Sequence, residues 1–127
     1  MRRIIVGAGI FVVIFFGCGE KKVDTAKLAQ GNQLVASGKY DQGIAILDAL
    51  GKDSPSDEAL KRARIEAHMK YANYLMYDSD LPPKQKYPEA LQNYRVVVSI
   101  DPNNQEAKGN VDLIEGIYRS MNRPIPQ

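Results

Sequence analysis

The chain has 127 residues, enough for one small domain, and its 17 basic and 15 acidic side chains give a formal net charge of +2. Both excess positive charges are Arg2 and Arg3, so the rest of the chain is formally neutral and lacks the basic surplus that nucleic-acid binding requires. The single cysteine, Cys18, excludes an internal disulfide and a multi-cysteine zinc site, so we expect stability to come from packed helices.

The N-terminal residues have the pattern of a secretory signal. Arg2 and Arg3 form a short positive start, and residues 4–16 carry no polar side chain. As a helix this run would rise roughly 20 Å, which is shorter than the ~30 Å hydrocarbon core of a bilayer and typical of the core of a signal peptide. The chain becomes polar abruptly at Glu20.

Gly17 and Cys18, which end this run, resemble the lipobox of bacterial lipoproteins, where a small residue precedes a cysteine that is diacylated at sulfur. The resemblance implies a lipoprotein signal peptide at 1–17, a lipid attached to Cys18, and a lipidated tether at 18–24. Two or three acyl chains anchor a protein durably to a membrane, whereas one chain alone gives marginal binding.

Phe15 and Phe16 depart from the usual lipobox, which prefers an aliphatic residue, commonly Leu, at the first position and a smaller residue at the second. Efficient cleavage of the signal is therefore an open question. Two alternatives also remain: an unmodified Cys18 beside an uncleaved membrane anchor, and an ordinary secretory signal that is cut nearby.

Beyond the leader, two stretches repeat one pattern at a step of 47 residues. Each copy has a tyrosine, a small residue three positions later, and a closing proline; the matching pairs are Tyr40 with Tyr87, Gly43 with Ala90, and Pro55 with Pro102. Bulky apolar residues follow each tyrosine by four, seven and ten positions, at Ile44, Leu47 and Leu50 and at Leu91, Tyr94 and Val97. This spacing predicts a helix with one apolar face in each copy.

The pattern resembles the second helix of a tetratricopeptide repeat, with its tyrosine, its small residue where paired helices touch, and its proline. Gly31 and Leu34 stand at matching positions of the first helix, whereas Lys27 replaces the usual aromatic residue. The resemblance implies an all-α domain at 25–121: a short solenoid of about two repeats plus a C-terminal capping helix. The alternative is a generic helical hairpin protein.

The segment between the two copies is long, because the usual repeat has 34 residues. Ser56, Asp57 and Glu58 predict a helix start, and apolar residues on one face extend the helix to about Tyr77. Prolines then break the helix, so we place an insertion around 78–86.

The register of this long helix has two solutions. Counting forward from the first copy puts Ala63 and Ala67 at the packing positions, whereas counting back from the second puts Tyr74 and Tyr77 there. We favour the forward count.

After the second copy, Asn103 or Asn104 is positioned to cap a last helix from Gln105 to about Met121. Its apolar face predicts a helix that covers the open end of the stack. The final segment, 122–127, contains two prolines, so we expect a flexible tail.

The residue types present predict no enzymatic activity and no cofactor other than the covalent lipid. His68 is the only histidine, and it shares a helical stripe with Tyr71, where we expect a packed structural residue. No glycine-rich phosphate loop is present, because Gly7 and Gly9 lie in the leader and not between a strand and a helix. We therefore assign no catalytic and no metal-binding residue.

The tetratricopeptide resemblance implies a concave groove, lined by the first helix of each repeat, in which a protein partner lies. By position the lining residues are Leu28, Asn32, Val35 and Ala36 from the first repeat and Lys61, Ile65, Met69 and Lys70 from the second, bordered by Leu113 and Ile117. The family's carboxylate clamp for chaperone C-termini is not implied, because Leu28 stands where the clamp requires a lysine.

Tyr71, Tyr74 and Tyr77 form a second candidate interface, since tyrosine buries a large area at a modest entropic cost. Core packing of the long helix explains the same residues, and both interpretations remain open.

Together these features predict a lipid-anchored adaptor that binds proteins of a bacterial envelope assembly, such as a pilus, secretion or outer-membrane assembly system. The alternatives are a scaffold that self-associates weakly, and an envelope enzyme or small-ligand-binding protein. In a cell with two membranes, Gly19 after the cysteine, where aspartate commonly signals inner-membrane retention, favours the periplasmic face of the outer membrane.

Overall fold

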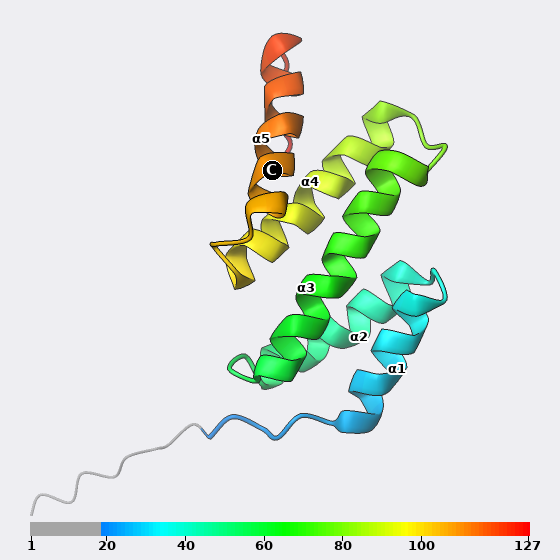
Figure 1. The fold of residues 1–127 in the computed structure, drawn as a ribbon, viewed down its shortest axis with the longest axis vertical. Helices are drawn as coiled ribbons and strands as arrows, with labels where there is room; N and C mark the ends of the chain where they lie inside the picture. The colour runs from blue at the N-terminus through cyan, green and yellow to red at the C-terminus, as the bar shows by residue number, and fades with distance from the viewer. Residues whose placement is uncertain (1–18) are drawn as a thin grey trace, which may run out of the picture.

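The computed structural model describes residues 19–127, which fold into helices joined by short turns (Figure 1). The helices are α1 (Thr25–Ala36), α2 (Tyr40–Asp53), α3 (Glu58–Asn73), the π-helix η1 (Tyr74–Asp78), α4 (Pro83–Ile100) and α5 (Gln105–Ser120). No strand occurs among these residues, so the all-α prediction is confirmed. The predicted signal peptide at 1–17 and the lipid-bearing Cys18 lie outside the described residues.

Short polar side chains cap the N-terminal ends of three helices. Asp24 accepts hydrogen bonds from the first amides of α1, Asp57 accepts from the Leu60 amide at 2.8 Å, and Asn104 accepts from the Ala107 amide at 2.9 Å. Each cap satisfies an amide that has no partner inside its helix, which fixes where the helix begins. Gly38 closes the turn between α1 and α2 with a φ of 77°, a conformation that side chains disfavour.

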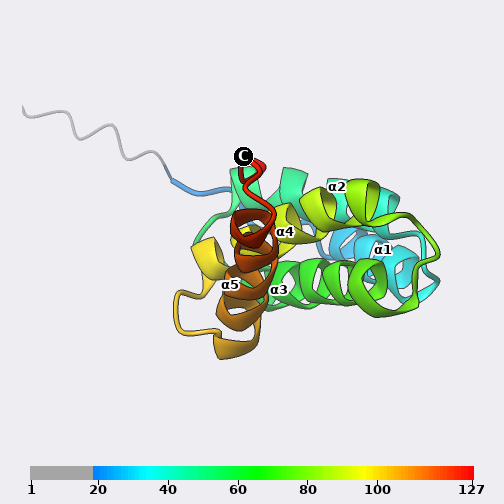
Figure 2. The ribbon, with the colours of Figure 1, turned by 90° about the horizontal axis from the view of Figure 1, so that it is seen from above.

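The helices form two antiparallel hairpins, α1–α2 and α3–α4, followed by α5. α3 packs on both α2 and α4, and α5 packs on α4. Seen from above, α1 and α3 lie on one side of the stack and α2 and α4 on the other (Figure 2). The long α3 therefore joins the two hairpins.

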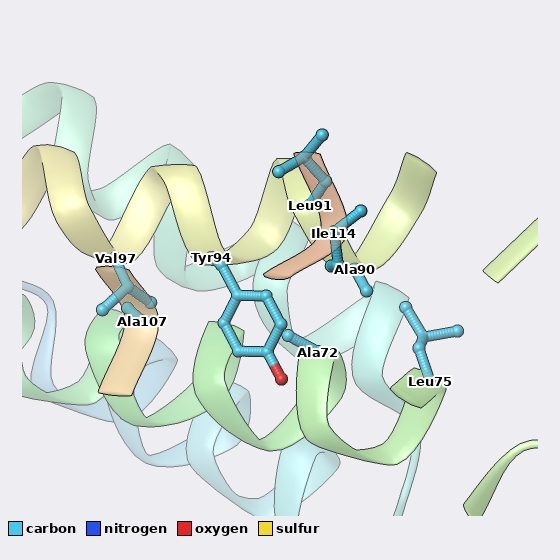
Figure 3. Close-up of a cluster of buried hydrophobic side chains, with 8 residues drawn as sticks. All are labelled: Ala72, Leu75, Ala90, Leu91, Tyr94, Val97, Ala107 and Ile114. Atoms are coloured by element: carbon cyan, nitrogen blue, oxygen red, sulfur yellow. The ribbon is translucent and has the colours of Figure 1, made fainter. Parts of the chain in front are cut away.

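Two apolar clusters make up the core. The first, between α1, α2 and the start of α3, consists of Val35, Leu47, Leu50, Leu60, Ala63 and Ala67. The second, between the end of α3, η1, α4 and α5, consists of Ala72, Leu75, Ala90, Leu91, Tyr94, Val97, Ala107 and Ile114 (Figure 3). One half of α3 thus packs in each cluster.

The first hairpin depends on a close approach of two backbones. A Cβ atom at Gly43 would lie 2.7 Å from the Gly31 carbonyl oxygen and 2.6 Å from Cγ2 of Val35. In the second hairpin the corresponding Ala90 is fully buried. The two small residues of the repeated pattern therefore both lie at helix contacts.

The insertion that we placed around 78–86 is much shorter in the structure, where only 79–82 separate η1 from α4. The additional residues are instead helical, since α3 continues into η1 and α4 begins at Pro83. A proline at the first helical position loses no internal hydrogen bond, so the Pro82-Pro83 pair starts a helix here and does not only end one.

The C-terminal segment, 122–127, has no regular structure, but it does not extend freely as we expected. The Pro126 carbonyl accepts a hydrogen bond from the Arg95 guanidinium at 2.7 Å, and Ile125 packs against the second cluster. The tail therefore belongs to the folded domain.

Candidate interaction surfaces

The predicted groove is assembled only in part. Asn32 and Val35 of α1 and Lys70 of α3 line a shallow hollow of about 250 Å³, together with Ala36, Ala63, Glu66 and Ala67. Val35 is 5% exposed and belongs to the first cluster, so it forms the floor of the hollow. Lys70 pairs with Glu66 at 2.7 Å and supplies, with Asn32, the polar rim.

The other four predicted lining residues lie outside this hollow. Leu28 packs against the first cluster, whereas Ile65 and Met69 pack against the second. Lys61 forms an ion pair with Glu58 at 2.8 Å, one helical turn away. Leu28, Ile65 and Met69 are therefore largely packed inside the protein, which corrects the eight-residue groove lining that the tetratricopeptide resemblance implied.

The tyrosine surface includes a residue that the sequence analysis did not assign to it. Tyr40, at the start of α2, stacks on Tyr71 with ring centroids 5.1 Å apart and lies 5.4 Å from the ring of Tyr74. The Tyr71 hydroxyl donates to the Glu89 carboxylate at 2.7 Å. Burial, together with this carboxylate, raises the pKa of Tyr71 above its usual value.

Tyr77 does not join this stack. Its ring is 66% exposed, and its hydroxyl donates to the Asn110 side chain of α5 at 3.2 Å. The predicted triplet therefore divides: two tyrosines, with Tyr40, join the first hairpin to α3, and Tyr77 lies beside α5. No local sequence signal links Tyr40 with residues more than thirty positions away.

His68 lies in a buried polar network between the two hairpins. Its ring is 4% exposed; Nδ1 lies 2.7 Å from Oδ1 of Asn93, and Nε2 lies 3.2 Å from Oδ1 of Asp48. The Asn93 amide nitrogen donates to the Glu89 carbonyl, which leaves its oxygen to accept from His68. Both ring nitrogens therefore lie within hydrogen-bond distance of an oxygen acceptor.

Asp48 in this network also accepts from the Nε of Arg64 at 2.8 Å. Burial of Asp48 acts to raise its pKa, but the hydrogen bonds and positive charges of His68 and Arg64 outweigh burial, so the pKa is lowered. A hollow of about 280 Å³ opens beside these groups. Because the polar atoms of this network form hydrogen bonds with one another, we interpret the network as structural.

A further hollow lies at the end of the helix stack away from the tether (Figure 1). It measures about 700 Å³ and lies between the start of α4 and the end of α5, lined mainly by Pro82, Pro83, Tyr87, Pro88, Ile117, Tyr118, Met121 and Pro124, with Lys84 and Arg123. This surface is not predictable from the sequence, because nothing in the sequence places 82–88 beside 117–124.

Within residues 19–127, no helix combines the length and the apolar character needed to cross a bilayer. In the same part of the chain, no group of three or more His, Cys, Asp or Glu side chains is arranged to hold a metal ion. Comparison of the chain with models of known protein families, with curated proteins and with solved structures gives no match.

Proposed function

We propose that the chain is a membrane-anchored lipoprotein with tetratricopeptide-like repeats, and that it acts as a non-enzymatic adaptor for proteins of a bacterial envelope assembly. The observation that carries the proposal is that both copies of the 47-residue pattern occupy equivalent places in successive hairpins. The equivalent buried pairs are Gly43 and Ala90, Leu47 and Tyr94, and Leu50 and Val97. This correspondence supports a stack of two repeats closed by α5.

The anchoring part of the proposal is supported by the sequence at Gly17-Cys18. It is tested by the intact mass of the protein extracted from bacterial membranes. We expect a species that begins at Cys18 and carries acyl-chain mass, and we expect this species to be absent from the Cys18→Ser variant. A full-length chain without added mass would contradict lipidation and would indicate an uncleaved N-terminal anchor.

The binding part of the proposal places an extended segment of the partner in the hollow between α1 and α3. This hollow has an apolar floor at Val35 and polar groups at Asn32 and Lys70, a combination typical of recognition sites. The proposed partner is a protein of a pilus, secretion or outer-membrane assembly system, reached from the periplasmic face of the outer membrane in cells with two membranes.

A photoreactive residue at position 32, introduced in the living cell, tests this site. We expect a cross-linked envelope protein whose yield falls strongly when Lys70→Glu is added. Lys108→Glu is the matched control, because it makes the same charge change on an exposed helical lysine of α5. Equal yields in the two variants would exclude the hollow as the binding site.

A self-associating scaffold is the second candidate function. It is favoured by the apolar hollow between α4 and α5, by the half-exposed Leu113 of α5 and by the half-exposed Met121 that follows α5. Sedimentation of the chain from Glu20 onward separates the two functions. A dimer at micromolar concentration that Met121→Lys dissociates would support the scaffold, and a monomer would support the adaptor.

A further inference from the structure

The residues that link the predicted anchor to α1 are fastened to the turn between α2 and α3. The Lys21 amide donates to the Asp53 carbonyl at 3.3 Å, and the Lys21 carbonyl accepts from the Ser54 hydroxyl. Ser54 is 4% exposed, so its hydroxyl is buried against the tether and shielded from competing water. A serine that is buried in a turn and bonded to the backbone of a linker holds that linker in one place.

Further contacts extend this attachment along residues 20–24. The Ser56 hydroxyl donates to the Glu20 carboxylate, and Val23 packs against the first apolar cluster. Asp24 then caps α1 through its side chain. Contacts of Glu20, Lys21, Val23 and Asp24 thus hold the tether against the domain up to the first helix.

The path of the chain keeps the α2–α3 turn close to Cys18, where the predicted lipid is attached. Only Gly19 and Glu20 separate Cys18 from Lys21, so even a fully extended chain places their Cα atoms at most about 11 Å apart. From Glu58 to Asp78, α3 and η1 extend away from this turn over about 30 Å. Figure 1 shows the tether and the α2–α3 turn at one end of the molecule and residues 79–82 at the other.

We propose that the α2–α3 turn is the membrane-facing surface of the protein, held against the lipid headgroups by the fastened tether. In this orientation α3 stands away from the bilayer, and the apolar hollow of α4 and α5 faces the aqueous compartment. The inference rests on the proposed function only in requiring membrane attachment at or before Cys18. An acylated cysteine and an uncleaved N-terminal anchor both meet that requirement.

Charged side chains of both signs lie at this end of the molecule. Lys21, Lys22 and Lys52 are exposed there, and Lys21 pairs with Asp53 at a distance of 3.6 Å. Surface pairs of this kind are weak, so Lys21 remains able to exchange its partner for a lipid phosphate. Because acidic residues are also present at this end, we assign the orientation to the tether and not to electrostatic attraction.

Spin labels on the membrane-bound full chain test the orientation. The protein is reconstituted in vesicles of phosphatidylethanolamine and phosphatidylglycerol that contain a nickel-chelating lipid, with a nitroxide attached to Lys52→Cys or to Lys84→Cys. Both positions are exposed lysines near a helix end, Lys52 at the end of α2 and Lys84 at the start of α4. These two helix ends lie at opposite ends of the molecule (Figure 1). We expect nickel in the headgroup layer to enhance relaxation several-fold more at position 52 than at position 84.

Ser54→Ala tests whether the tether contacts cause this difference. The variant removes the buried hydroxyl without adding volume, so the ratio between the two labels should fall towards one. Ser37→Ala is the matched control, because the Ser37 hydroxyl bonds to the Gln33 carbonyl at the far end of α1. Hydrogen exchange at the Lys21 amide provides a second readout, and it should become faster in Ser54→Ala alone.

The outcomes separate this inference from the proposed function. A chain that does not sediment with the vesicles would refute membrane attachment, which the proposed function requires. A chain that does sediment but shows equal relaxation at positions 52 and 84 would overturn the orientation and leave the anchor intact. A preserved ratio in Ser54→Ala, with unchanged exchange at Lys21, would overturn the role of the tether.

Discussion

Gly43 is the residue at which the first hairpin has least space for a side chain. An added Cβ atom would lie within 3 Å of the Gly31 carbonyl oxygen and of the Val35 amide nitrogen, and backbone atoms cannot move aside as a side chain can. We therefore expect Gly43→Ala to lower the free energy of unfolding by about 1–3 kcal/mol, the usual cost of overpacking. Denaturant unfolding monitored by circular dichroism measures this change.

Gly109 provides the matched control, because it also lies inside a helix but has open space where its side chain would stand. Gly109→Ala should raise the free energy of unfolding by about 0.5–1 kcal/mol, since alanine restricts the unfolded chain and favours the helix. Two Gly→Ala changes with opposite signs would establish that the effect at Gly43 is one of space. Equal effects would contradict the close approach of α1 and α2.

Asp48 is a residue through which the free energy of unfolding should depend on pH in the acidic range. Its pKa in the folded chain lies below the ordinary value of 3.8, so the folded state binds fewer protons than the unfolded state in that range. Its contribution to stability is therefore present above the ordinary pKa and is lost as the pH falls towards the folded pKa. We expect the free energy of unfolding to fall less steeply below about pH 4 in Asp48→Asn than in the native chain.

The control for Asp48→Asn is Asp112→Asn, which removes one carboxylate from the exposed face of α5. This change should leave the slope with pH close to that of the native chain. Thermal or urea unfolding between pH 3 and pH 6 gives both slopes. If Asp48→Asn retained the native slope, the His68 and Arg64 contacts would not account for the acid sensitivity.

The sequence identified some residues of the candidate surfaces but could not determine their neighbours. The tetratricopeptide resemblance implies that Asn32, Val35 and Lys70 line a groove, and these three residues do share one hollow. Ile65 and Met69 stand at lining positions of the same pattern, yet they pack inwards, because the second hairpin covers that side of α3. The amphipathic pattern of a helix reveals its apolar side but not which part of that side a later helix will cover.

At the scale of the elements, the sequence predicted the helix starts that have a side-chain cap, but not the start of α4, which has none. The acidic and amide caps at Asp57 and Asn104 are local signals, so the helix starts that they mark are visible in the sequence. The beginning of α4 was missed because Pro82-Pro83 was interpreted as a break, although proline also favours the first turn of a helix. η1 ends α3 with a π-helix, for which no sequence signal was available.

The C-terminal segment shows how a proline-rich element acquires order from contacts far along the chain. Ile125 packs against the second cluster, and Arg95 joins the Pro126 carbonyl to the Glu115 carboxylate. We expect Ile125→Ala to lower the free energy of unfolding by about 1 kcal/mol, because the three carbon atoms that are removed lose a half-buried position. Urea unfolding measures the change, and the exposed Gln127→Ala should have no effect. A tail that is free in solution would give no effect in either variant.

At the scale of the whole molecule, α3 determines how the two hairpins depend on each other. In long helical solenoids each repeat contacts only its neighbours, so unfolding can begin in one repeat and spread. Here one helix supplies Leu60, Ala63 and Ala67 to the first cluster and Ala72 to the second, as Figure 3 shows for Ala72. The hydrogen-bond network around His68 and the stacking of Tyr40 on Tyr71 provide two further connections between the hairpins.

This coupling predicts that damage to the first cluster destabilises the second. Leu47 is 1% exposed at the centre of the first cluster, so Leu47→Ala should lower the free energy of unfolding by about 2–5 kcal/mol through the cavity that it leaves. If α3 unfolds as one element, the free energy of opening measured by hydrogen exchange must fall by the same amount for the amides of α4 and of α2. Leu113→Ala, at a half-exposed position of α5, should change neither set. Loss of protection confined to α1 and α2 would mean that the hairpins unfold separately, and that α3 can keep its second half folded when the first half loses its partners.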